Sequence, residues 1–154
     1  MRIRKTLFGV AVTAVMSVGS LALAAPAGAA VTLETRLLGA NEVPGPGDGD
    51  GEGGARVRIN VQEGRICYGI SVRRIDLPAI GAHIHRGRAG VAGPVVVALN
   101  NPTRVDTTGI GLSFGCERRL PKALLRRIRA NPQRFYVNIH TSAYPDGAVR
   151  GQLG

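Results

Sequence analysis

Residues 55–62, ARVRINVQ, alternate apolar and polar side chains at successive positions. Successive side chains of a β-strand point to opposite faces, so this alternation is typical of a strand with one buried face. Glu63 and Gly64 follow as a turn, and residues 66–74, ICYGISVRR, run on with a second strand-like pattern. The two segments predict an antiparallel β-hairpin and favour a β fold for the rest of the chain.

Short strand-like segments continue through most of the sequence. They lie at residues 31–39, 82–86, 94–99, 107–116, 135–141 and 148–153. Glycine and proline, which interrupt regular structure, recur between them about every ten residues. This spacing predicts an all-β fold, an antiparallel Greek-key sandwich or barrel of about seven or eight strands.

One segment, residues 121–131, has the spacing of a helix instead of a strand. Pro121 stands at its start, where its fixed backbone suits a first helical turn, and Asn131 precedes a second proline at its end. The apolar side chains of one stripe are Ala123, Leu124, Leu125 and Ile128. The other face of this segment is basic, and a basic amphipathic helix can lie on a membrane. This one has only about ten residues, so we expect it instead to cover one end of the core.

The first thirty residues have the order of a secretory signal peptide. A basic start, MRIRK, precedes an uncharged apolar run, and Ala27, Gly28 and Ala29 form a small-residue cleavage motif. We therefore expect cleavage near Ala29 and Ala30 and a mature chain, residues 31–154, that forms a single secreted, extracellular domain. No later apolar run has the length of a membrane span, so no transmembrane segment is predicted after cleavage.

The charge of the mature chain is strongly positive. Loss of Arg2, Arg4 and Lys5 with the leader lowers the formal net charge from +10 to +7. The chain has three tyrosines, three phenylalanines and no tryptophan, so it lacks the basic and aromatic mixture of a nucleic-acid surface. We predict no specific nucleic-acid binding. An extracellular protein or polysaccharide is the expected partner.

Cys67 and Cys116 are the two cysteines of the chain. In an exported protein an even pair most often forms a disulfide. Free thiols and a metal site are the alternatives, but the spacing has no C-x-x-C element. The prediction is a disulfide between Cys67 and Cys116.

The three histidines all fall in strand-like segments. His83 and His85 lie two residues apart, so a strand would place both rings on one face. If the strand that carries His140 passes beside them, three ring nitrogens converge, which is a ligand set that zinc and copper both accept. The alternative is that the histidines are ordinary polar residues on the solvated faces of their strands.

Three blocks of the sequence resemble a known family. They are GANEVP (39–44), AHIHRGRAGVAGPVVVAL (82–99) and FYVNIHTSAYPDGAVRGQL (135–153), and together they are similar to the CHRD domain, which is named for chordin and also occurs in exported bacterial proteins. The resemblance runs from about Leu33 to Leu153. It implies a secreted β domain, since in chordin this domain belongs to a secreted antagonist that binds growth-factor ligands.

A fainter resemblance concerns the histidines. The H-x-H strand is similar to the strand of copper/zinc superoxide dismutase that supplies two copper ligands, His140 falls near another, and Arg150 matches that enzyme's late arginine. The chain has no fourth histidine to bridge two metals, which excludes a full dismutase site. A reduced three-histidine site is compatible with the sequence.

Two functions therefore stand as hypotheses. The first is a non-catalytic binding or surface-associated module with no catalytic residues. The second is a copper- or zinc-binding metalloprotein, with redox activity as one option. His83, His85 and His140 would be its ligands, and Glu42 and Arg150 would support the ligands without binding the metal. Stoichiometric metal that depends on the histidines separates the two.

Overall fold

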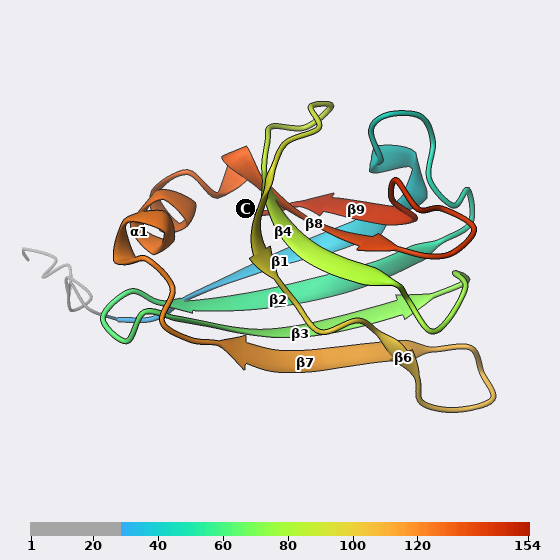
Figure 1. Ribbon diagram of the computed structural model, residues 1–154, viewed down its shortest axis with the longest axis horizontal. Helices are drawn as coiled ribbons and strands as arrows, with labels where there is room; N and C mark the ends of the chain where they lie inside the picture. Colours follow the sequence, from blue (N-terminus) through green and yellow to red (C-terminus); the bar gives the residue numbers. More distant parts are fainter. Residues whose placement is uncertain (1–28) are drawn as a thin grey trace, which may run out of the picture.

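A computed structural model describes residues 29–154 and shows nine strands joined in one antiparallel sheet (Figure 1). Their order across the sheet is β5-β4-β8-β9-β1-β2-β3-β7-β6. The strands are β1 (Val31–Leu38), β2 (Glu52–Asn60), β3 (Arg65–Arg73), β4 (Gly81–Arg86), β5 (Val95–Ala98), β6 (Thr103–Arg104), β7 (Gly111–Glu117), β8 (Phe135–His140) and β9 (Val149–Gln152). The helical elements are α1 (Lys122–Ala130) and the short 3-10 turns η1 (Gly39–Asn41) and η2 (Pro132–Arg134).

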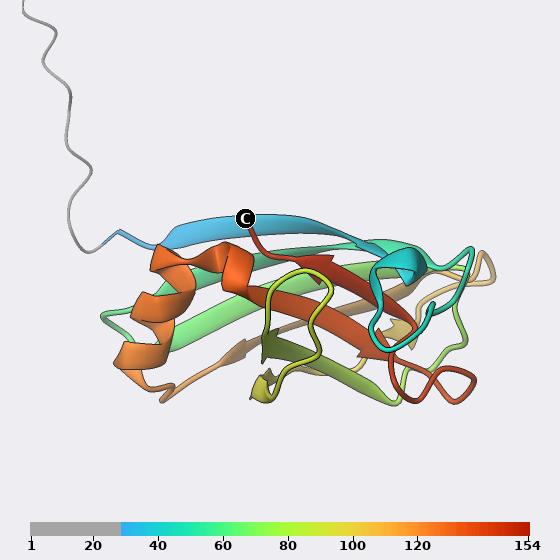
Figure 2. The same ribbon diagram turned by 90° about the horizontal axis from the view of Figure 1, so that it is seen from above.

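The sheet curls on itself, so that β4 and β8 lie across from β2 and β3 (Figures 1 and 2). The core fills the space between the two halves. Its fully buried side chains come from both, for example Val57 and Ile66 from one half and Ile84 and Val137 from the other. The predicted all-β sandwich or barrel is confirmed, with two-residue β6 bringing the count of strands to nine.

The hairpin predicted from the alternating pattern is present as β2 and β3. Arg58 pairs with Cys67 in its register, and Val57 and Ile59 are fully buried while Arg58 faces solvent. At the turn Gly64 adopts a positive φ of 61°, a conformation that glycine accepts without steric cost. Local alternation and turn chemistry thus agree with the tertiary structure here.

The predicted helix is also present and closes one end of the core (Figures 1 and 2). Leu124, Leu125 and Ile128 are buried, and the carbonyl of Pro121 accepts hydrogen bonds from the amides of Leu124 and Leu125 at 2.9 and 3.2 Å. Ala123, which the sequence placed on the apolar stripe, is exposed. Three larger side chains fill the contact with the sheet, so this small residue is left on the solvent side.

The predicted signal peptide lies, except for its last two residues, outside the described part of the chain. Within residues 29–154, no helix combines the length and the apolar character that crossing a bilayer requires.

Candidate metal centre

The histidines lie on β4 and β8, on the polar face of the sheet, and the neighbouring strand β9 continues this face. Ala82 and Ile84 of β4 point into the core, so His83 and His85 point the other way. β8 alternates in the same manner, with its buried Val137 and Ile139 in the apolar core. The side chains on the polar face are His83, His85, Tyr136, Asn138, His140, Arg150 and Gln152.

Direct pairing of β4 with β8 brings the third histidine to the first two. In the antiparallel register His83 faces Asn138 and Gly81 faces His140, so the rings of His83 and His140 are diagonal neighbours. Their centroids are 5.2 Å apart. A side chain at Gly81 would have its Cβ 3.1 Å from both rings, so the glycine leaves the space that the two imidazoles occupy.

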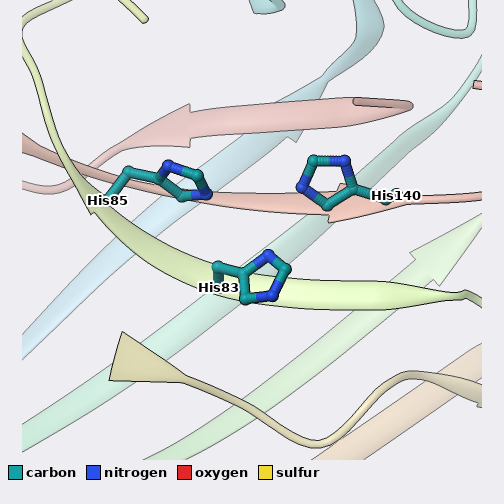
Figure 3. Close-up of side chains that lie close together, drawn as sticks. All are labelled: His83, His85 and His140. Atoms are coloured by element: carbon teal, nitrogen blue, oxygen red, sulfur yellow. The ribbon is translucent and has the colours of Figure 1, made fainter. Parts of the chain in front are cut away.

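One ring nitrogen from each of the three histidines lies within 4.8 Å of the other two. Figure 3 shows the rings turned toward a common space, with His83 and His85 on one strand and His140 on the next. The centroid of His85 is 5.5 Å from that of His83 and 6.3 Å from that of His140. The convergence that the sequence left conditional on strand pairing is therefore present.

Backbone carbonyls orient two of the rings. His85 Nδ1 donates to the carbonyl of Gly93 at 2.7 Å, and His140 Nδ1 donates to the carbonyl of Pro145 at 2.8 Å. A carbonyl oxygen only accepts, so each Nδ1 carries the proton and each neutral ring keeps a lone pair on Nε2. Both Nε2 atoms are buried without a hydrogen-bond partner, as is Nδ1 of His83.

The surroundings favour neutral imidazoles. Burial lowers the pKa of His83, and the neighbouring imidazoles of His140 and His85 lower it further, because a charge on either ring would repel a charged His83. Burial also lowers the pKa of His85. Neutral imidazole is the form that binds a metal ion, because protonation occupies the lone pair. His83 and His85 are thus favoured in the form that coordination requires.

Behind the histidines lies a layer of buried polar groups. The ring of His85 stacks on Tyr136, with centroids 4.8 Å apart and planes 12° apart. The guanidinium carbon of Arg150 lies 3.4 Å from the centroid of Tyr136. Arg150 Nη2 also donates to the carbonyls of Arg88 and Val91 at 2.8 and 3.0 Å. Arg150 therefore reaches the histidines through Tyr136 and supports the loop above them.

Glu42 is buried beside this layer, with 7% of its surface exposed. Burial raises its pKa from 4.5 to about 7, although the charge of Arg150 and hydrogen bonds from Val43 and Asn138 act in the opposite direction. Within residues 29–154 no hydrogen bond joins Glu42 to a histidine ring, and its Oε1 has no partner. The structure thus places Glu42 near the cluster but separates it from the rings.

Sequence reasoning overlooked Tyr136 and the two carbonyls that orient the rings. Tyr136 precedes His140 by four residues on one strand, so the same alternation that singled out the histidines places it on their face. The carbonyls of Gly93 and Pro145 could not be singled out from the sequence, because every residue has a backbone carbonyl.

The predicted disulfide between Cys67 and Cys116 is present and joins facing residues of β3 and β7. The described residues contain no free cysteine. Ile66 and Tyr68 lie in the core, so Cys67 between them points away from the core on one half of the sheet. The histidines point away from the core on the other half, so the covalent link is separate from the histidine cluster. A disulfide in a small domain fits an oxidising, extracellular setting.

The fold and the site define a small, disulfide-linked β domain with a buried polar face. Residues 33–153 match the CHRD domain, which covers nearly all of the described chain, and the protein belongs to the CHRD domain family. A search of curated proteins finds no match. Membership of this family supports a role as a binding module and confirms the resemblance of the three sequence blocks.

Proposed function

We propose that this protein is an exported binding module that holds one copper or zinc ion between His83, His85 and His140. The observation that carries the proposal is the set of three buried, unpartnered ring nitrogens directed at one another. Leaving buried polar atoms unpaired costs stability, and an ion placed among them would satisfy all three at once.

Three imidazoles are a sufficient but open ligand set. Zinc in proteins prefers four ligands and copper also accepts imidazole nitrogen, so either ion would keep a position for water or an outside group. The carbonyls of Gly93 and Pro145 would fix the ring orientations, which is the usual role of hydrogen bonds to metal-bound histidines. Arg150 would act through Tyr136, and Glu42 through Asn138, as partners that position the site without binding the ion.

Export is part of the same proposal. The leader-like residues 1–30 and the disulfide between Cys67 and Cys116 support a mature domain that works outside the cytoplasm. An exported module with an open metal position would bind its ion from the surroundings after secretion and folding.

The test is metal content of the mature protein, purified from an exported and oxidised preparation and exposed separately to copper and to zinc. We expect about one ion per chain by inductively coupled plasma mass spectrometry, and an increase in the melting temperature upon binding. His83→Gln should weaken binding more than about tenfold, because it removes one of three ligands.

His83 is the suitable position because its ring has no hydrogen bond to the backbone within residues 29–154, so its loss disturbs the fold least. Asn101→Ala, an exposed change in the loop after β5, is the matched control and should retain the ion. Failure of the wild-type protein to retain either metal, or equal retention by His83→Gln, would refute the proposed site.

A further inference from the structure

A pocket of about 470 Å³ lies between the end of β4, the end of α1 and the turn η2. Four arginines line it, together with Asn131, and we call it the arginine pocket: Arg86, Arg88, Arg127 and Arg134. They come from two stretches that are distant in sequence, residues 86–88 and residues 127–134. Figure 2 shows the loop after β4 lying close to η2 and to the end of α1.

Hydrogen bonds hold the walls of the arginine pocket together. The amide of Gly87 donates to the carbonyl of Arg134 at 2.9 Å. Gln152 Nε2 donates to the carbonyls of Gly87 and Phe135, both at 2.8 Å. The backbone that carries the arginines is therefore arranged before any ligand arrives, which lowers the entropic cost of binding.

The pocket has positive charge without internal compensation. None of its lining residues is acidic. The ion pairs within residues 29–154 involve other arginines, on or next to β1, β2 and β3: Arg36, Arg56, Arg65, Arg73 and Arg74. Like charges that share a pocket repel one another, so an anion bound among the four would remove an unfavourable interaction. Guanidinium groups also match the paired oxygens of sulfate and carboxylate.

The lining favours a polysaccharide over other polyanions. Phe135, its one aromatic residue, is 2% exposed and offers no face on which a nucleic-acid base could stack. The apolar residues of α1 are buried in the core, so the helix has no apolar face to insert into a membrane. We infer that the arginine pocket binds the sulfate or carboxylate groups of an acidic polysaccharide, independently of the histidine cluster.

The test uses the mature protein freed of metal by a chelator, with fluorescence anisotropy of labelled heparin as the sulfated probe and labelled polygalacturonate as the carboxylated probe. We expect binding to at least one probe that weakens with salt, and none to neutral dextran. The double variant Arg86→Gln/Arg134→Gln should lose about tenfold or more in affinity.

The matched control is Arg36→Gln/Arg56→Gln, which removes two positive charges on the strands outside the pocket. Its affinity should stay close to that of the wild type. Arg88→Gln/Arg127→Gln serves as a second pocket variant if the first does not fold, as judged by thermal unfolding. His83→Gln should bind the probes normally, which separates this inference from the metal proposal.

Three results would overturn the inference. The first is that the protein binds neither polysaccharide. The second is that the pocket variant and the control variant lose the same affinity. The third is that duplex DNA or anionic vesicles bind as tightly as the polysaccharides and depend on the same pocket arginines. The second would reduce the effect to net charge, and the third would assign the pocket to another class of partner.

Discussion

At the scale of single residues, Glu42 is a carboxyl group that the fold has largely removed from water. Its raised pKa of about 7 follows from burial, which disfavours the charged form more than Arg150 and the two hydrogen bonds favour it. Near pH 7 this side chain therefore exchanges a proton, which an exposed glutamate does at a much lower pH. The free energy of folding must depend on pH in the same range.

The sign of that dependence follows from linkage. The folded protein binds the Glu42 proton more tightly than the unfolded chain, so this contribution to stability is fully present below pH 4.5 and is lost as the pH rises through about 7. Glu42→Gln keeps the volume and removes the titration. We expect the free energy of unfolding of the variant to rise relative to the wild type by on the order of 2–3 kcal/mol between pH 5 and pH 8.

Urea unfolding of both proteins at the two pH values measures this difference. Glu34→Gln removes an exposed carboxyl group and is the control, with an expected effect within about 0.5 kcal/mol. A gap between Glu42→Gln and the wild type that stays constant with pH would show that Glu42 titrates as it does in the unfolded chain.

At the scale of elements, the pairing of β4 with β8 creates the histidine cluster. A shift of that register by one residue would turn the polar face of β4 into the core and Ile84 out to solvent. The buried Ala82, Ile84, Val137 and Ile139 oppose such a shift, so the core and the cluster depend on the same register. The disulfide acts on a different pair, β3 and β7.

This separation predicts that the disulfide stabilises the fold without shaping the site. The double variant Cys67→Ser/Cys116→Ser should lose about 2–4 kcal/mol of unfolding free energy, because the bridge closes a long loop and restricts the unfolded chain. Urea unfolding measures the loss, and metal analysis of the folded variant should still find the wild-type stoichiometry. Loss of metal from the folded variant would contradict the separation.

At the scale of the whole molecule, acidic partners are unevenly distributed over the surface. Arginines on or beside β1, β2 and β3 are paired with Glu34, Glu52 and Glu63. The arginine pocket, between the end of β4, α1 and η2, has no such pairs within residues 29–154. Uncompensated positive charge therefore gathers at the arginine pocket, which the net charge of the sequence does not show.

The proposed export also concerns the whole chain and makes a prediction about the mass of the protein. We expect the protein recovered outside the cell to begin within a residue of Val31 and to have the mass of the disulfide-bonded chain from that point. Ala29→Phe should block cleavage by placing a large side chain in the small-residue motif. Ser20→Ala is the control, and intact mass spectrometry distinguishes the products. Recovery of uncleaved wild-type protein outside the cell would contradict the predicted signal peptide.

Much of the fold was predictable because it depends on local pattern. The alternation in residues 55–62, the turn at Gly64 and the stripe of Leu124, Leu125 and Ile128 each express a period that neighbouring residues share. The disulfide was predictable because the chain has an even pair of cysteines and a leader-like start, which together indicate a disulfide. Ala123 was misplaced because its burial depends on which side chains fill the contact, and the two-residue β6 is too short to show a period.

By itself, then, the sequence determined the β class, the positions of the main strands and helix, the face shared by His83 and His85, and the family. The tertiary structure decided which strands are neighbours. Only the pairing of β4 with β8 brings His140 to the other two rings, and only the approach of η2 to the loop after β4 assembles the arginine pocket. Periodicity is a local property, whereas these contacts join segments about fifty residues apart through backbone groups that carry no residue identity.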